Sequence, residues 1–289
     1  MDAPTPGTYP PPRHLLRDLG LVVEHRPDGA GRGTIAVHPG LTDPGGRPWV
    51  GVVATLVDVV AGGLAARVAA PGWIATADLD LALVDAGPCR RVGATGAVVH
   101  AGRTTVVVGV ELDADGAPLG LASLAFAVLQ RRPHNPEVPV ARTERWELGA
   151  PATSRSIVDE AGIRAHPGAT DRRRDGTTVP GATMPVSPYV RNSLGATQGG
   201  ALALLAEQAA LRHGSSGAPS ARLVDLHLTY LALARTGPLE ARVVAGSEEA
   251  TRVVEIRDTG AQGRTTTLVT ATVVPASPGV PSSSGRSTR

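Results

Sequence analysis

The sequence predicts an α+β protein built from two divergent copies of one unit, each a long helix packed on an antiparallel sheet. The chain has 289 residues, which suits two domains of ordinary size. Two apolar runs, 50–61 and 199–210, have the length of helices, and similar strand and turn patterns follow both. Aromatic residues make up only 2% of the chain, so Val, Leu and Ala must fill the cores.

The two copies are offset by about 150 residues. Asp58 and Glu207 hold matching positions in the two helical runs, 149 residues apart, and Leu56 and Leu205 stand two residues before them. Strands and turns repeat at a similar spacing. The expected strands are 76–84, 103–112 and 119–129 in the first copy and 223–230, 251–258 and 264–274 in the second. The Gly-Pro turns at 87 and 237 also correspond.

These patterns predict four segments. The first domain covers 13–132, a proline-containing linker covers 133–151, and the second domain covers 152–275. The remaining residues, 276–289, are rich in Ser, Gly and Pro, and we expect them to be disordered.

The first helical run is apolar nearly all round, so it should be buried on most sides. A buried acid on such a helix has to be paired or functional, because desolvating a carboxylate is costly. Asp58 and Glu207 are therefore candidate functional residues.

The second copy carries a motif that starts before its helix. It consists of Asn192, Gly195, the run Gln198-Gly199-Gly200, Leu205 and Glu207. This pattern resembles the hotdog thioesterases of the phenylacetate-pathway (PaaI-like) type and, more loosely, the 4-hydroxybenzoyl-CoA thioesterases. The first copy departs from it, because Trp49, Val50 and Gly51 replace Gln-Gly-Gly and only Gly51, Leu56 and Asp58 are kept.

The resemblance implies two tandem hotdog domains and an enzyme that hydrolyses acyl thioesters without a cofactor. In that family a backbone amide at the helix start polarises the thioester carbonyl, and a carboxylate attacks it or activates water. Free N–H groups at a helix start do stabilise an oxyanion, and glycine allows close approach. The implied catalytic residues are Asp58, Glu207, Gln198, Gly199 and Asn192, and the implied substrate-binding residues are Gly200, Gly51, Val50 and Trp49.

Structural roles remain open for four of these side chains. Asp58 could be a buried structural acid, and Glu207 could lie on the helix surface. Gln198 could cap its helix, and Asn192 could shape its loop.

Helix geometry adds a constraint on which acid serves which helix start. Glu207 lies eight residues beyond Gly199, which is roughly 12 Å along a helix. A side chain cannot reach back over that distance, so each acid should serve the helix of the other copy. One site would join Gln198 and Gly199 to Asp58, and the other would join Trp49 and Val50 to Glu207. We expect the first site to be active, because bulk obstructs the second.

Composition excludes several other function classes. The net charge is +2, and no basic stripe alternates with aromatic residues, so nucleic-acid binding is not expected. Arg172, Arg173 and Arg174 predict a polar loop, with contact to coenzyme A phosphates as the alternative. Cys89 is the single cysteine, and no pair of histidines has metal-ligand spacing, so neither a disulfide nor a metal site is expected.

The expected location is the cytoplasm, with no membrane partner, because residues 1–12 lack a signal-peptide core and no long uninterrupted apolar stretch follows. The expected substrate is an acyl-CoA or acyl-carrier thioester. Two alternatives remain, a non-catalytic acyl-CoA-binding protein and a hotdog hydratase or dehydratase, the latter suggested by His38 before Pro39. Leu, Val and Tyr on the sheet faces also lead us to expect a homodimer.

Overall fold

The structure is a computed structural model that describes residues 9–84, 87–132, 135, 137–138, 140–149, 155–166, 181–212, 221–246 and 251–275. The predicted tail and the three consecutive arginines at 172–174 lie outside these residues. The helices and strands follow the same order in both halves of the chain, as the repeat predicts. Each half has a short helix, two short strands, a 3-10 turn, one long helix and four strands.

The first half contains α1 (Leu15–Asp18), β1 (Val22–His25), β2 (Gly31–Ala36), η1 (Pro39–Leu41), α2 (Val50–Ala69), β3 (Trp73–Leu83), β4 (Arg91–Ala101), β5 (Thr105–Ala114) and β6 (Ala117–Leu129). The second half contains α3 (Ile157–Glu160), β8 (Arg164–His166), β9 (Gly181–Met184), η2 (Pro188–Val190), α4 (Gly199–Arg212), β10 (Ala221–Tyr230), β11 (Leu239–Gly246), β12 (Thr251–Asp258), η3 (Thr259–Ala261) and β13 (Arg264–Pro275). The sequence analysis did not predict β4 or β11. It also missed β7 (Glu144–Glu147), which lies inside the predicted linker and pairs with β1.

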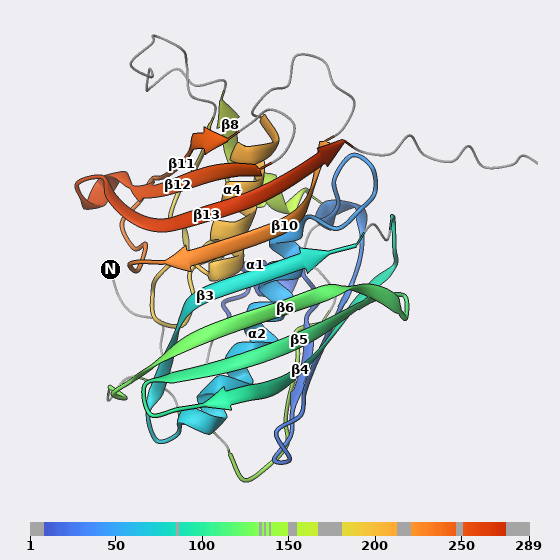
Figure 1. Cartoon of the computed structure of the whole chain (residues 1–289), viewed down its shortest axis with the longest axis vertical. Coiled ribbons are helices and arrows are strands. Elements are labelled where there is room, and N and C mark those ends of the chain that lie inside the picture. The colour runs from blue at the N-terminus through green and yellow to red at the C-terminus, as the bar shows by residue number, and fades with distance from the viewer. Residues whose placement is uncertain are drawn as a thin grey trace, which may run out of the picture.

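The strands form one 13-stranded antiparallel sheet in the order β7-β1-β2-β4-β5-β6-β3-β10-β13-β12-β11-β9-β8. Both long helices lie behind this sheet in Figure 1, α2 behind the strands of the first half and α4 behind those of the second. The predicted α+β class is therefore confirmed, with each long helix packed on antiparallel strands.

The two halves meet at the centre of the sheet, where β3 pairs with β10 from Asp78↔Thr229 to Ala82↔Asp225. Each of these strands has one irregularity, between Thr76 and Asp78 in β3 and between Leu223 and Asp225 in β10. Superposing the two bulges matches Thr76 with Leu223, and further along the strands it matches Leu83 with Tyr230. These matched pairs recur at the two helix starts.

The first turns of α2 and α4 pack against each other through glycine. A Cβ placed on Gly51 would lie 2.5 Å from backbone atoms of Leu204, and one placed on Gly200 would lie 2.6 Å from the Cα of Thr55. Because no side chain fits in either gap, the two helices approach closely. This contact brings the acid of each helix to the beginning of the other helix.

Helix α2 is long enough to span a membrane, and the mean hydropathy of an 18-residue window within it is 1.8. However, 56% of that window is buried inside the protein. Val52, Leu56 and Val60 are among its fully buried side chains. A core helix passes the same test, and α2 occupies the place of a core helix here.

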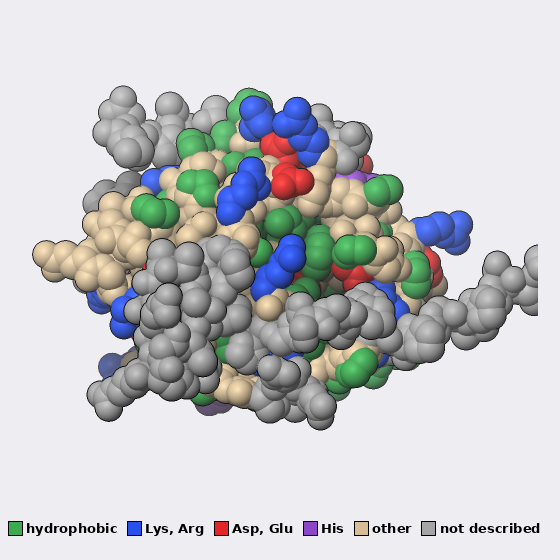
Figure 2. Space-filling view, turned by 90° about the horizontal axis from the view of Figure 1, so that it is seen from above, with side chains coloured by type: hydrophobic (Ala, Val, Ile, Leu, Met, Phe, Trp, Pro, Cys, Tyr) green, Lys and Arg blue, Asp and Glu red, His purple; other side chains and the backbone are tan. Residues whose placement is uncertain are grey.

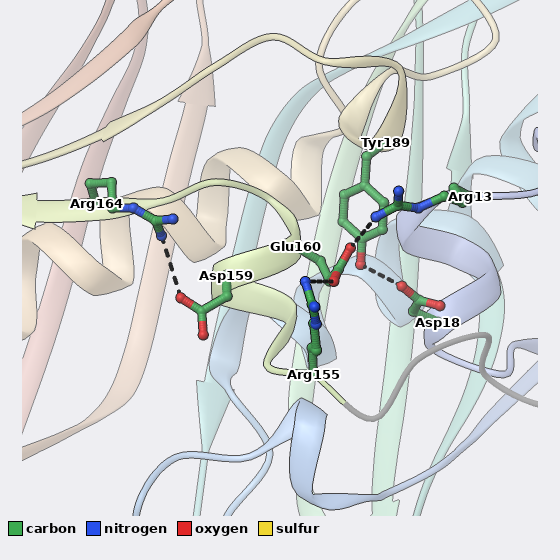
Figure 3. Close-up of polar contacts among 7 residues, drawn as sticks. All are labelled: Arg13, Asp18, Arg155, Asp159, Glu160, Arg164 and Tyr189. Atoms are coloured by element: carbon green, nitrogen blue, oxygen red, sulfur yellow. Dashed lines mark hydrogen bonds and ion pairs between the residues drawn. The ribbon is translucent and has the colours of Figure 1, made fainter.

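Polar contacts tie residues 13–18 to the second half (Figure 3). The Tyr189 hydroxyl of η2 donates to Oδ2 of Asp18 over 2.9 Å in a buried contact. Arg13 forms an ion pair of 2.8 Å with Glu160 of α3, although exposed pairs of this kind stabilise little. The His14 ring also contacts the backbone oxygen of Arg191 at 2.7 Å. The segment before α1 is thereby held next to the loop that leads into α4.

Candidate active site

The start of α4 presents two backbone N–H groups without an acceptor. The helix begins at Gly199, directly after Gln198, whose own N–H donates to the oxygen of Val190 over 2.8 Å. The N–H of Ala201 turns back to the oxygen of Gln198. Within the described ranges, nothing accepts from the N–H groups of Gly199 and Gly200. Because the first N–H groups of any helix lack an intrahelical partner, both groups still have a hydrogen to donate.

Asp58 lies beside this helix start, although it belongs to the first half. A Cβ placed on Gly199 would lie 3.0 Å from Oδ2 of Asp58. Its other oxygen, Oδ1, accepts a hydrogen bond of 2.9 Å from the Thr76 hydroxyl of β3. Burial raises the pKa of Asp58 to about 6, and the bond from Thr76 opposes the shift. A carboxylate with such a pKa suits a general base at neutral pH.

Two tyrosines complete the surroundings of Asp58. The Tyr230 hydroxyl would lie 2.8 Å from a Cβ on Gly199, at the end of β10. The Tyr9 hydroxyl accepts a hydrogen bond of 2.6 Å from Nε2 of Gln198. Burial raises the pKa of both phenols, and the negative charge of Asp58 raises both further. We call Gly199, Gly200, Asp58, Thr76 and Tyr230 together the α4 site, and Tyr9 lies next to it.

The start of α2 is occupied by the protein itself. Oε1 of Glu207 accepts from the N–H of Val50 over 3.0 Å, and Oε2 accepts from the N–H of Gly51 over 2.9 Å. Glu207 is only 3% exposed, so this residue is buried, and it borders a hollow. Burial raises the pKa of Glu207 to about 7, although the two hydrogen bonds lower it. The place an oxyanion would take is filled.

Apolar side chains replace the hydroxyl groups around Glu207. A hollow at this end of α2 is lined by Leu83 and Leu223, the residues that match Tyr230 and Thr76, together with Trp49 and Val50. We call Val50, Gly51, Glu207, Leu83 and Leu223 the α2 site. Chain length accounts for the different positions of the acids, because Glu207 has one methylene more than Asp58. That methylene lets its carboxylate reach the helix N–H groups.

Asn192 shapes the loop before α4. Its Oδ1 accepts from the N–H of Leu194 over 2.9 Å and from the N–H of Ala196 over 3.0 Å. Gly195, with φ of +73°, provides the turn that closes this loop. The side-chain oxygen of Asn192 is therefore used within the loop, which is the structural role left open for it.

Three residues in or next to the α4 site were not predicted from the sequence, namely Thr76, Tyr230 and Tyr9. Thr76 lies on β3 directly before its bulge, so alternation along the strand does not show that it points towards the helices. The alternation Leu226, Leu228, Tyr230 was a usable signal, because it places Tyr230 on the buried face.

No metal site accompanies these residues. Among the described residues, no group of three or more His, Cys, Asp or Glu side chains could hold a metal ion. His38 is also accounted for, because its Nδ1 accepts from the N–H of Gly40 and its Nε2 contacts the backbone oxygen of Asp18.

Comparisons with solved structures agree on the fold. An acyl-ACP thioesterase from Bacteroides thetaiotaomicron is 14% identical, with a TM-score of 0.53, over 85% of this chain and 98% of that one. A tesB protein from Mycobacterium avium subspecies paratuberculosis is 14% identical, with a TM-score of 0.55, over 85% and 93%. A protein of unknown function with a hot dog fold from Alicyclobacillus acidocaldarius is 15% identical, with a TM-score of 0.53, over 86% and 94%.

At these identities the likeness shows the fold, which is that of the hotdog proteins. No protein-family model matches the sequence, and no curated protein matches it either.

Proposed function

We propose that the chain hydrolyses acyl thioesters, carried by coenzyme A or an acyl carrier protein, at the α4 site. The observation that carries this proposal is the pair of unpaired N–H groups of Gly199 and Gly200 beside Asp58. An oxyanion needs donors at a helix start, and hydrolysis needs a base near the carbonyl carbon. The name of one similar structure, an acyl-ACP thioesterase, supports the same reaction class.

In the proposed reaction the thioester carbonyl oxygen points at the two glycine N–H groups. The Asp58 carboxylate takes a proton from water as the water oxygen forms a bond to the carbonyl carbon. The tetrahedral intermediate then collapses, the C–S bond breaks, and the leaving sulfur receives the proton from Asp58. The products are a carboxylic acid and a thiol, and Asp58 is again a carboxylate. No cofactor takes part.

The test is thiol release from a panel of acyl-CoA esters that differ in chain length, branching and aromatic content. We expect turnover with at least one ester by the wild-type chain and its loss in Asp58→Asn. Cys89 is a free thiol, so a protein blank corrects the readout. Absence of turnover over the whole panel, including acyl-carrier esters, would contradict the proposal.

A non-catalytic acyl-CoA-binding protein is the second candidate, because Glu207 closes the α2 site. Binding of acyl-CoA by calorimetry without thiol release would select it. A hydratase is less well supported, since the ring nitrogens of His38 already contact backbone groups.

We further propose that the chain forms a homodimer in the cytoplasm. Val99 on β4 and Leu121 on β6 are 72% and 63% exposed, and both line a hollow on the outer face of the first half. A second copy of the chain would cover them. The end of the molecule seen from above in Figure 2 carries arginine and acidic side chains among apolar ones. Sedimentation that shows only a 29.4 kDa species at high concentration would contradict the dimer.

A further inference from the structure

The Tyr230 hydroxyl is buried, and in the described part of the chain it has no hydrogen-bond partner. Leaving a buried hydroxyl unpaired costs about 1–3 kcal/mol, so such a group needs an explanation. A Phe at this position would avoid the cost.

The position of Tyr230 follows from the strand that carries it. Leu226 and Leu228 are fully buried on the helix side of β10, and Tyr230 continues that alternation at the end of the strand. The phenol therefore points at the start of α4. It is a rigid group with two side-chain torsions, so its hydroxyl is held in place with little entropy cost.

The hydroxyl lies beside Gly199, as does the carboxylate of Asp58. A Cβ on Gly199 would be 2.8 Å from the Tyr230 oxygen and 3.0 Å from Oδ2 of Asp58. The two oxygens are thus separated by no more than the sum of these distances, 5.8 Å, yet no hydrogen bond joins them. Thr76 holds the Asp58 carboxylate by its other oxygen.

The hydroxyl also keeps its proton, which decides the role it can have. Burial and the charges of Asp58 and Asp78 raise the pKa of Tyr230 well above its ordinary value. A phenol in that state donates a hydrogen bond and does not act as a base.

The matched position in the other half lacks this group. Leu83 stands where Tyr230 would be, in the site where Glu207 already occupies the helix N–H groups. The chain thus places a hydroxyl donor at the helix start whose N–H groups have no acceptor among the described residues, and an apolar side chain at the one that Glu207 fills.

From this geometry we infer that Tyr230 is a third hydrogen-bond donor of the α4 site, a catalytic residue that contacts the thioester beside Gly199. The inference rests on the proposed function and adds a residue to it. The hydroxyl donates to the oxygen that becomes negative when water adds to the carbonyl carbon. No proton leaves Tyr230, and the hydrogen bond weakens again when the C–S bond breaks.

The experiment compares wild type with Tyr230→Phe, which removes only the hydroxyl oxygen. We expect kcat to fall about 100-fold, the scale for loss of one oxyanion donor, with KM changed less than about threefold. We also expect the melting temperature to stay equal or to rise, because the variant no longer buries an unpaired hydroxyl. A purely structural tyrosine would give the opposite result for stability.

Three other outcomes would overturn the inference. If Tyr230→Phe keeps at least half of the wild-type kcat, Tyr230 is not a catalytic residue, while the proposed function stands. If Tyr230→Phe loses activity and melts several degrees lower, the hydroxyl has a structural partner. If the wild-type chain releases no thiol from any ester, the proposed function and the role of Tyr230 fail together.

Discussion

Helices α2 and α4 hold matching places in the fold, but their first turns lie in different chemical surroundings. At α4 no described residue accepts from the N–H groups of Gly199 and Gly200, and hydroxyl groups lie nearby. At α2 the carboxylate of Glu207 fills the same place among leucine side chains. An acid beside a helix start is therefore not enough to define a site. One methylene and a few neighbouring side chains decide whether the N–H groups at a helix start are already paired.

Substitution of the two acids is the most direct test of the difference between the two helix starts. We expect Asp58→Asn to lower kcat at least about 100-fold, because it removes the proposed general base. Glu207→Gln should change kcat less than about threefold, since that carboxylate contacts only the α2 site. Steady-state thiol release measures both variants under the same conditions. The reverse ranking would mean that the α2 site performs the chemistry.

The pH dependence of stability should single out Glu207. Its pKa is raised from 4.5 to about 7 on folding, so the folded state holds the proton more tightly than the unfolded state. The stability tied to Glu207 is therefore full below about pH 4.5 and declines up to about pH 7, by at most about 3 kcal/mol.

The pKa of Asp58 is raised from 3.8 to about 6, so the stability tied to Asp58 declines in the same way over that pH range. We expect Glu207→Gln to flatten the curve between pH 6 and pH 7 and to leave the Asp58 part in place. Urea unfolding of wild type and variant across this pH range gives the difference between their free energies of unfolding. The contributions of groups outside the α2 site cancel in that difference. Parallel curves would contradict the assigned cause.

The helix contact predicts opposite effects for two glycines. Gly200→Ala would press a methyl group against the backbone of Thr55, so we expect a loss of about 1–3 kcal/mol in the free energy of unfolding. Gly62→Ala on α2 has no neighbour closer than 3.8 Å and should stabilise the protein by up to about 1 kcal/mol. Denaturant unfolding monitored by circular dichroism compares them. Equal effects would show that the helices are not held by close glycine contact.

The smallest expected effect concerns the replaced motif. The double variant Trp49→Gln and Val50→Gly restores the motif of the second copy at the start of α2. We expect kcat/KM to change less than about twofold, because Glu207 still binds the N–H groups. A gain of more than about fivefold would show that side-chain bulk, and not the carboxylate, closes the α2 site.

Patterns that act over short stretches of sequence could be predicted. The two long helices and the repeated order followed from apolar runs and matched turns. The cross-pairing of acids and helix starts followed from the rise of a helix, because Glu207 lies too far from Gly199 on its own helix. In the structure, both acids do lie beside the other helix.

The rest depends on contacts between distant residues. Thr76 reaches the α4 site only because β3 has a bulge, which no local pattern marks. Whether the N–H groups at the start of α2 are paired depends on how far the Glu207 side chain extends. β7 was missed because it is short and partners β1, more than a hundred residues earlier.

The exchange of acids across the glycine contact has a consequence for how such a chain diverges. If one hotdog unit formed a symmetric dimer, each substitution would fall on both sites at once, and no site could lose its ligand contacts while the other kept them. In this chain the two helix starts have different sequences, so a substitution at one leaves the other unchanged. The arrangement also creates a dependence, because the first half carries Asp58 to the start of α4 and the second half carries Glu207 to the start of α2. Neither half can be deleted without taking a part from the site of its neighbour.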